Sequence, residues 1–461
     1  MKTALFVTLS FILLLFSCRK DSFITSPDAN VSISADTLHY DTVFTTVGSV
    51  TQSFKIINEN NQKLRLSSVK LMGGPSSFFK MNVDGIATTE STGIELEAND
   101  SVYVFVQVNV DPATGNLPFI IRDSIQISYN GNDRLVQLEA WGQNAHFLRE
   151  KVISSSETWT NDLPYVIQGY LYVDAGQTLT LEKGCRIYVH ADAPVIVDGT
   201  LKVNGEKDTI DRVYFRGDRL DEPYKDFPAA WPGIYFRATS NGNVLNYAVI
   251  KNSYQAIAVE DPSPTAGPKL TLNQCEIDNS YESGIIALNS SITATNCLIT
   301  NCGKNIAMGK GGDYKFTHCT VASYSNFFIQ HKYPVLTLSD VDGTSTVRLE
   351  ALFQNCIFWG ESDQLDDEVV VEKTGTNGTV TFENVLWRVK TVPPNVIESI
   401  NNQDPQFDSI DVSKNYYDFR LNKKNSPAVD TGGANTSVFI DLDGNPRPGG
   451  LKPDLGCFEK Q

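Results

Sequence analysis

The chain has 461 residues, which is room for roughly two or three domains. Hydrophobic residues make up 41% of it and charged residues 20%, a balance that is ordinary for a folded protein and excludes wholesale disorder. The formal net charge of −16 argues against nucleic acid as a partner and against charge-driven binding to anionic lipid. The 24 Phe and 18 Tyr residues, against 4 Met, favour strands.

The N-terminus has the pattern of an export signal. Lys2 precedes an apolar run over residues 11–16 that is too short for a comfortable membrane span, and Cys18 follows closely. We therefore predict a signal peptide over residues 1–17. Residues 15–18 resemble the bacterial lipobox, and the resemblance implies cleavage before Cys18 and attachment of that cysteine to membrane lipid. The alternative is an ordinary secretory leader followed by a coincidental cysteine.

Residues 18–30 are polar and indicate a flexible tether between the lipid and the first domain. The pair Lys20-Asp21 resembles the short charged tracts that follow the lipidated cysteine in some surface-exported lipoproteins of Gram-negative bacteria. The resemblance implies a lipid-anchored protein of the cell envelope, at the outer membrane or the cell surface, with the membrane as its partner. The sequence leaves open whether the protein faces the periplasm or the exterior.

Residues 31–145 carry short runs of alternating apolar and polar residues between turn signals, which is typical of a β-sandwich. Landmarks are the run FKIIN at residues 54–58, NDS at 99–101 and AWG at 140–142. This order resembles the immunoglobulin-like modules of bacterial surface proteins and of the ASPM–SPD-2–Hydin group over residues 36–143. Such modules act as spacers or bind partners, so the resemblance implies no catalysis here.

From about residue 150 the strands become short and a repeat begins. The hexamer QCEIDN at residues 274–279 recurs as NCLITN at 296–301 and as HCTVAS at 318–323, so the three cysteines are 22 residues apart. Such a repeat predicts a parallel β-helix over residues 150–461, because each rung buries its inward face only against its neighbours. A leucine-rich repeat has a similar length but requires a leucine consensus that this sequence lacks.

The repeat assigns a place to the cysteines. We expect Cys275, Cys297 and Cys319 to stack one per rung, with their thiols facing inward as small apolar groups. Asn279 and Asn301 are expected near bends, where amides can bond to turn backbone. Of the 8 cysteines, those after residue 18 are odd in number, which is a poor basis for a disulfide framework, and no spacing indicates zinc. A redox or metal ladder is the less favoured alternative.

Two groups of motifs resemble known families. LTLEKGC at residues 179–185 and VDGTL at 197–201 make residues 152–217 similar to the opening rungs of right-handed β-helix proteins of the pectate-lyase-like superfamily. The last sixty residues or so resemble the end of the choice-of-anchor Q group of such proteins, through DPQF at 404–407, SPAVDTG at 426–432, DLDGNPR at 441–447 and DLGCFE at 454–459. The resemblance implies a right-handed coil with a C-terminal cap motif over residues 404–459.

No catalytic residue can be assigned. Lyases and hydrolases of the β-helix superfamily that this sequence resembles carry motifs such as Gly-His-Gly or Arg-x-Pro-x-x-Arg, and this sequence has neither. The five histidines are scattered, and each is expected at the surface or satisfied by structural hydrogen bonds: His39, His146, His190, His318 and His331.

One loop, residues 217–233, mixes acids, bases and aromatic residues as sugar-binding surfaces do, because sugar rings stack on aromatic side chains and carboxylates bond hydroxyl groups. The candidate ligand-binding residues are Asp218, Arg219, Asp221, Glu222, Tyr224 and Trp231. The competing interpretation is a structured loop that covers the side of the helix.

Two acidic groups have the oxygen ligands that Ca²⁺ prefers. One group is Asp441, Asp443 and Asp454, and the other is the loop at residues 363–368. Structural hydrogen bonding for the first group and a solvated turn for the second are the favoured interpretations, and no other cofactor is expected.

These patterns together predict an all-β protein, with an immunoglobulin-like β-sandwich followed by a right-handed parallel β-helix. The leading functional hypothesis is non-catalytic binding of a polysaccharide or another cell-surface component. The alternatives are a polysaccharide lyase or glycoside hydrolase with an unrecognised site, and a structural envelope protein. The sequence does not indicate an oligomeric state.

Overall fold

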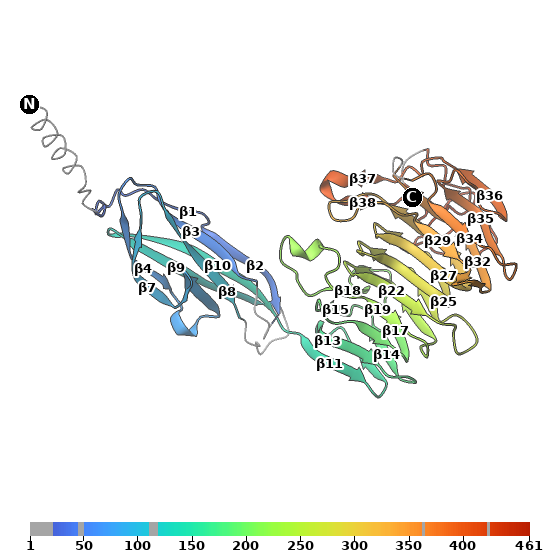
Figure 1. The fold of residues 1–461 in the computed structure, drawn as a ribbon, viewed down its shortest axis with the longest axis horizontal. Coiled ribbons are helices and arrows are strands. Elements are labelled where there is room, and N and C mark those ends of the chain that lie inside the picture. The colour runs from blue at the N-terminus through green and yellow to red at the C-terminus, as the bar shows by residue number, and fades with distance from the viewer. Residues whose placement is uncertain (1–21, 45–49, 110–118, 362–364, 422–424) are drawn as a thin grey trace, which may run out of the picture. The chain divides into compact units, whose positions relative to one another are not determined.

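A computed structural model gives the fold of the chain (Figure 1). The described residues are 22–461 except 45–49, 110–118, 362–364 and 422–424. Contacts divide the chain into two compact units, Met1–Asn144 and Ala145–Gln461. Within the described ranges, no helix is both long and apolar enough to cross a membrane.

The first unit is a sandwich of two five-stranded sheets. Along β8 (Ser101–Val108) the valines are buried, whereas Tyr103 and Phe105 point outward and are exposed. Apolar side chains from both sheets form one core, which confirms the predicted β-sandwich. In sheet order the strands are β1 (Val31–Ile33), β3 (Gln52–Asn58), β8, β5 (Phe79–Val83) and β6 (Ile86–Ala87), and then β2 (Thr37–Phe44), β10 (Asn132–Gln143), β9 (Phe119–Tyr129), β4 (Leu64–Leu71) and β7 (Glu90–Leu96). A short 3-10 helix, η1, spans Gly74–Ser76.

The second unit is a parallel β-helix, as predicted, and it begins at His146 with β11 (His146–Ile153). Each turn of the coil contributes strands to three parallel sheets, which we call sheets 1, 2 and 3. Long strands bend at a corner and serve two sheets, as β25 (Ser283–Thr295) does for sheets 2 and 3. The inward side chains of all three sheets form one continuous core, because each rung covers the apolar face of the next.

The strands of this coil are assigned by their pairings. Sheet 1 contains β13 (Tyr165–Val173), β15 (Arg186–Val189), β18 (Val213–Gly217), β21 (Ala248–Lys251), β24 (Glu276–Asp278), β26 (Leu298–Thr300), β28 (Thr320–Ser323) and β33 (Ile357–Gly360). Sheet 2 contains β16 (Val195–Val197), β19 (Ile234–Phe236), β22 (Gln255–Glu260), β25, β27 (Lys304–Thr317), β29 (Leu336–Ser339) and β34 (Val369–Glu372). Sheet 3 contains β12 (Glu157–Trp159), β14 (Thr178–Glu182), β17 (Thr200–Asn204), β20 (Asn243–Asn246), β23 (Leu270–Asn273), β32 (Leu349–Gln354), β35 (Val380–Trp387) and β36 (Val396–Asn401).

The corner between sheets 3 and 1 carries the predicted cysteine ladder. Cys275, Cys297 and Cys319 are buried. They lie on consecutive rungs, since the amide of Leu298 donates to the Cys275 carbonyl and that of Thr320 to the Cys297 carbonyl. The residue before each of these cysteines, and before Cys356 of the next rung, has a positive φ, a conformation that Asn adopts more readily than most residues: Gln274, Asn296, His318 and Asn355. Every described cysteine is a free, buried thiol, so the prediction of inward packing is confirmed.

The C-terminal segment differs from the predicted cap motif over residues 404–459. It lies along the outer side of sheet 1, where the Gly456 amide donates to the Asn355 carbonyl over 2.8 Å and the Cys457 amide to Oγ1 of Thr320 over 3.0 Å. Apolar side chains hold the segment there. Ile357 on β33 and Leu386 at the end of β35, which pairs with β33, point outward from sheet 1 and join the C-terminal residues in a second core. The segment therefore covers the side of the coil rather than its end. Its own elements are β37 (Ser409–Asp411), η3 (Val412–Lys414) and β38 (Tyr416–Asp418).

Candidate functional site

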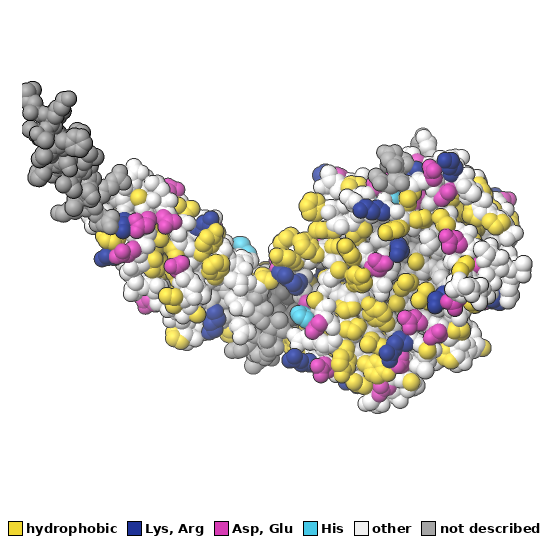
Figure 2. All heavy atoms as spheres, in the orientation of Figure 1, with side chains coloured by type: hydrophobic (Ala, Val, Ile, Leu, Met, Phe, Trp, Pro, Cys, Tyr) yellow, Lys and Arg dark blue, Asp and Glu magenta, His cyan; other side chains and the backbone are white. Residues whose placement is uncertain are grey.

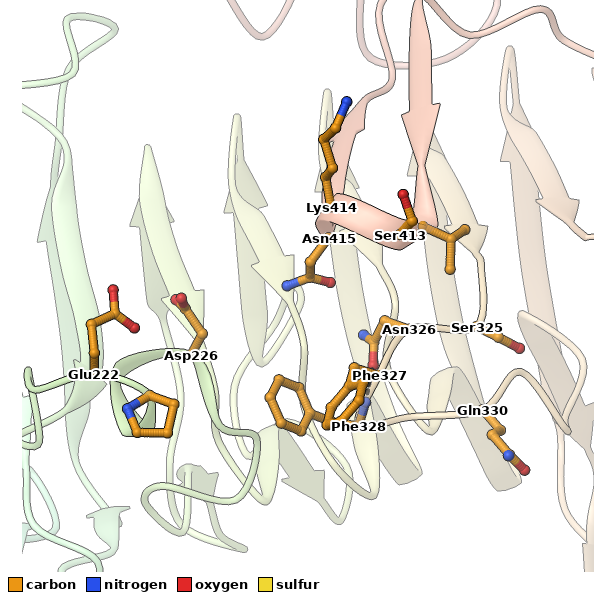
Figure 3. A pocket seen from close by; sticks show the side chains of 12 residues that line it. Glu222, Asp226, Ser325, Asn326, Phe327, Phe328, Gln330, Ser413, Lys414 and Asn415 are labelled. Carbon is orange, nitrogen blue, oxygen red and sulfur yellow. Dashed lines mark hydrogen bonds between the residues drawn. The ribbon is translucent and has the colours of Figure 1, made fainter.

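A pocket of about 690 Å³ lies beside the corner between sheets 1 and 2 (Figure 3). Three segments line it, all from outside the regular rungs. The loop after β18 contributes Glu222, Pro223 and Asp226; the loop after β28 contributes residues 325–328 and Gln330; and the turn between β37 and β38 contributes residues 412–415. Figure 1 places the loop after β18 and the β37–β38 hairpin on the same side of the coil.

Side-chain amides at the corner between sheets 1 and 2 hold the loop after β18, which forms the first wall of the pocket. Asn252 and Asn279 end successive rungs of sheet 1 with positive φ, and Nδ2 of Asn279 donates to Oδ1 of Asn252 over 2.8 Å. The same two amides donate to the backbone of η2 (Tyr224–Asp226), over 2.7 Å to Lys225 O and 2.9 Å to Asp226 O. The prediction that Asn279 and Asn301 sit at bends is confirmed, since Asn301 also has a positive φ.

A tight turn supplies the aromatic part of the pocket. Oδ1 of Asn326 accepts hydrogen bonds from the amides of Phe328 and Ile329, at 2.8 Å and 2.6 Å. This turn projects the Phe327 ring into solvent, where 91% of the residue is exposed. Phe328 packs between the loops, with its ring 5.3 Å from that of Phe327 and 4.8 Å from that of Phe227. An almost fully exposed ring beside a packed one is a surface that an apolar ligand face can cover.

Polar groups stand on both sides of these rings. In Figure 3 the carboxylates of Glu222 and Asp226 lie to one side, and Lys414 and Asn415 come from the opposite segment. Glu222 is paired with Lys225, whereas the Asp226 carboxylate has no hydrogen bond or ion pair among the described residues. The Lys414 ammonium is paired with Asp411 over 3.1 Å, so the pocket offers carboxylate acceptors and an amide around an apolar centre.

The turn that carries Lys414 is fixed by Asp411. Its carboxylate accepts hydrogen bonds from the Ser413 hydroxyl over 2.6 Å and from the Lys414 amide over 3.2 Å. These bonds hold the pKa of Asp411 below its usual value. Asn415 then takes a left-handed conformation, with φ 50, which ends η3 and turns the chain into β38.

Of the predicted ligand-binding residues, Glu222 lines the pocket. Arg219 instead pairs with Asp221 over 2.9 Å and lies over the ring of Tyr224, with its Cζ 3.5 Å from the ring centroid. Asp218 bonds to His190 over 2.7 Å, and burial raises the pKa of its carboxyl. The Arg219 contacts are internal to the loop, and the Asp218 bond joins the loop to the end of β15. Both support the competing interpretation of a structured loop for this part of it.

The prediction that Trp231 is part of an exposed platform is wrong. Only 1% of the residue is exposed, and its Nε1 donates to the Lys251 carbonyl over 2.9 Å. Trp231 lies in the core of the coil, because the chain has re-entered the rung by this point and bridges to Ser253. A Trp next to a Pro-Gly pair therefore marks the end of the loop.

Several pocket residues were not predicted. Asp226 lies in the predicted loop but is not among its candidate residues, and Phe327, Phe328, Lys414 and Asn415 lie outside that loop. The adjacent Phe327 and Phe328 fall after the third cysteine repeat, where no strand continues, which is the one sequence signal that could have drawn attention to them.

The Ca²⁺ candidates are engaged in structural contacts. Asp443 pairs with Arg420 over 2.7 Å, and the Asp441 and Asp454 carboxylates accept backbone amides, for example from Asn445 and Lys460, each over 2.7 Å. Across the described ranges, no three His, Cys, Asp or Glu side chains gather as metal ligands would. These aspartates therefore make structural hydrogen bonds within the C-terminal segment.

The second acidic loop is partly outside the described residues, which omit 362–364. Its last residue, Glu368, is not in a solvated turn. The Glu368 carboxylate is fully buried and lies 2.9 Å from Nε2 of His331, which is itself almost completely buried. A carboxylate held in this way is unavailable to a surface cation. The predicted lipid-attachment residue, Cys18, also lies outside the described residues.

Hydrophobic side chains gather over the face of the β-helix unit seen in Figure 2, with both signs of charge interspersed.

A family described as "Right handed beta helix region" matches residues 168–321, which lie inside this unit. The chain therefore contains a right-handed parallel β-helix, as predicted. No curated protein matches the chain.

Three solved structures show distant similarity. One is the catalytic unit of a thermostable GH87 alpha-1,3-glucanase from Streptomyces thermodiastaticus strain HF3-3, at 10% identity over 76% of this chain and 89% of that chain, with a TM-score of 0.24. Another is a family 123 glycoside hydrolase from Clostridium perfringens, at 10% identity and a TM-score of 0.19; 26% of this chain is covered, and it spans only 30% of that enzyme's length. The third is an ASH/PapD-like domain of human CEP192, at 9% identity over 28% of this chain and 92% of that chain, with a TM-score of 0.18. At these TM-scores none of the similarities bears on activity.

Proposed function

We propose that the chain binds a polysaccharide at the cell surface, without cleaving it, through the pocket around Phe327. The observation that carries the proposal is the exposed Phe327 ring, flanked by the carboxylates of Glu222 and Asp226 and the amide of Asn415. A sugar ring has an apolar face that stacks on such a side chain and hydroxyl groups that bond to the polar rim. The pocket volume of about 690 Å³ suits a short stretch of a sugar chain.

The test is binding of the mature chain to an array of bacterial and plant polysaccharides, followed by affinity measurement on the glycan retained. Phe327→Ala should lower the affinity about two- to tenfold, because a lost aromatic contact is worth roughly 0.5–1.5 kcal/mol. Phe439→Ala is the matched control, since Phe439 is 73% exposed and does not line the pocket. Equal affinity of both variants would overturn the assignment of the pocket, and a silent array would favour an architectural role.

Glycoside hydrolysis or lysis is the second candidate, favoured by the two carboxylates on one side of the pocket. The Asp226 carboxylate has no hydrogen bond or ion pair among the described residues, and Glu222 lines the same pocket. A reducing-sugar assay and an absorbance assay for unsaturated uronates separate the two chemistries. Turnover that is abolished by Asp226→Asn and by Glu222→Gln would replace binding by catalysis as the function of the pocket.

Anchoring is part of the proposal. Lipid on Cys18 would hold the protein at the outer membrane or cell surface, because several acyl chains together bind a bilayer far more firmly than one. The variant Cys18→Ser should move the protein from the membrane fraction to the soluble fraction. A variant that stayed with the membranes would contradict the lipid anchor.

A further inference from the structure

The start of sheet 1 carries a second pocket, of about 410 Å³, which is lined by two arginines and two tyrosines. Arg186 and Tyr188 point outward from β15, and Tyr214 and Arg216 point outward from β18. The strand register places Arg186 opposite Tyr214 and Tyr188 opposite Arg216, so cation and ring alternate in both directions. We call these four residues, with Thr209 and Ile210 at the rim, the Arg–Tyr pocket.

The rings hold the guanidinium groups in place. Nη2 of Arg216 donates to the Tyr188 hydroxyl over 3.0 Å, and its Cζ lies 5.0 Å from the centroid of that ring. The Cζ of Arg186 lies 6.0 Å from the ring of Tyr214, whose hydroxyl donates to the Thr209 carbonyl over 2.9 Å. Arginine has five N–H donors, so both side chains retain several for a ligand.

The charge of these two arginines is not balanced locally. Among the described residues, no carboxylate lies within ion-pair distance of Arg186 or Arg216. Other arginines of the same unit do have such partners: Arg212 with Glu276, Arg219 with Asp221, Arg237 with Asp198, Arg348 with Asp313, Arg420 with Asp443 and Arg447 with Glu459. Two unpaired, exposed cations side by side are notable in a chain whose net charge is −16.

We propose that the Arg–Tyr pocket binds an oxyanion carried by a glycan, a uronate carboxylate or a sulfate ester. This rests on the proposed function. Planar guanidinium groups bind carboxylate and sulfate oxygens with two parallel hydrogen bonds, which makes Arg the preferred residue for such groups. The partly exposed Tyr214 ring and the exposed Ile210 provide the apolar surface on which the sugar ring bearing the oxyanion rests.

The position of the pocket favours a sugar chain over a small ion. β18 ends at Gly217 and leads directly into the loop that carries Glu222 and Asp226, so one segment joins the two pockets. A polymer that crosses this segment can place an acidic residue at the Arg–Tyr pocket and another ring against Phe327. The acidic rim at Glu222 and Asp226 repels a second oxyanion, which assigns the charged residue of the ligand to the Arg–Tyr pocket.

The experiment measures the affinity of the mature chain for three probes: polygalacturonate, dextran sulfate and a neutral galactan. Arg186→Gln and Arg216→Gln should each lower the affinity for one of the two acidic probes at least about tenfold, and the probe affected identifies carboxylate or sulfate. The affinity of wild-type protein for that probe should also fall with added salt. Arg149→Gln is the matched control, because Arg149 is exposed and has no carboxylate partner among the described residues either.

The outcomes separate this inference from the proposed function. If the galactan binds in a Phe327-dependent way while both arginine variants keep wild-type affinity for both acidic probes, the Arg–Tyr pocket is not an oxyanion site. If an acidic probe binds through Arg186 and Arg216 and Phe327→Ala has no effect, the inference holds and the pocket around Phe327 loses its role. Absence of binding to all three probes would overturn the inference.

Discussion

The Arg447 guanidinium donates a hydrogen bond to Nδ1 of His318 over 2.6 Å, joining the C-terminal segment to the cysteine corner of the coil. His318 occupies the same place in its rung as Asn296 and Asn355 do in theirs, with φ 53. Nε2 of the same imidazole lies 3.0 Å from Nδ2 of Asn355 and 3.2 Å from Oγ1 of Thr436. Burial and the adjacent Arg447 lower the pKa of His318 to about 2, from 6.5.

The depressed pKa of His318 predicts a pH dependence of stability. Below pH 6.5 His318 is mostly protonated in the unfolded chain, whereas in the folded chain it stays neutral down to about pH 2. This contribution to the free energy of unfolding is complete above pH 6.5 and falls as the pH is lowered, by about 2 kcal/mol between pH 7 and pH 5.

The matched variant is His318→Asn, which places in this rung the residue that the neighbouring rungs already have. Denaturant titrations followed by tryptophan fluorescence report mainly this unit, since Trp159, Trp231, Trp359 and Trp387 all lie in it. The variant should lose about 2 kcal/mol less than the wild type on going from pH 7 to pH 5. Parallel losses in the two proteins would contradict the role assigned to His318.

The cysteines predict a chemical behaviour. All described thiols are buried, which shields them from a reagent in solution. Burial also raises the pKa of Cys302 to about 12, so the reactive thiolate of this residue is scarce at neutral pH. In native protein carrying Cys18→Ser, iodoacetamide should label no thiol within hours, whereas labelling in denaturant should be complete. Rapid native labelling of Cys275, Cys297 and Cys319 would contradict the buried ladder.

The coil could be predicted because every rung repeats the same local requirement. A residue that tolerates positive φ, a small inward thiol and a short strand recur at Asn296-Cys297 and His318-Cys319, and repetition makes this pattern visible in one sequence. The sandwich was visible for a similar reason, since burial alternates along β8 as its sequence does.

The pocket could not be predicted in the same way, because its three walls interrupt the repeat. Glu222, Phe327 and Lys414 are far apart in the chain and meet because amides at the corner and the apolar outer side of sheet 1 hold their segments. A single sequence shows that each segment departs from the rung pattern but not which departures come together. Trp231 was misplaced for the same reason: loop composition does not reveal where the chain re-enters the core.

The amides of the corner predict how the first wall of the pocket is held. Asn279→Gly keeps the positive φ but removes the hydrogen bonds to Asp226 O and Asn252 Oδ1. We expect a loss of about 1–3 kcal/mol in stability and faster proteolysis within residues 218–230. The control is Asn289→Gly, since Asn289 also has a positive φ but no side-chain bond to this loop. Equal proteolysis of the two variants would show that the amides do not hold the loop.

Among the substitutions proposed here, we expect a change at Lys269 to lower the stability of the coil most. Its side chain is buried, and Nζ donates to three backbone carbonyls, those of Arg237 over 3.1 Å, Ala238 over 3.0 Å and Glu260 over 2.6 Å. The ammonium thus uses all of its donors at this corner, and burial lowers its pKa. The Arg237 carbonyl also accepts from the Ser240 amide over 3.0 Å.

Lys269→Met keeps the length of the side chain but takes the ammonium donor from the Ala238 and Glu260 carbonyls, at a cost of about 2–5 kcal/mol. Lys202→Met is the control, because Lys202 is exposed on the outer face of β17. Thermal unfolding at neutral pH should show a clear drop in Tm for Lys269→Met and little change for Lys202→Met. A Tm for Lys269→Met equal to that of the control would mean that water replaces the ammonium at this corner, and the carbonyls would then not depend on Lys269.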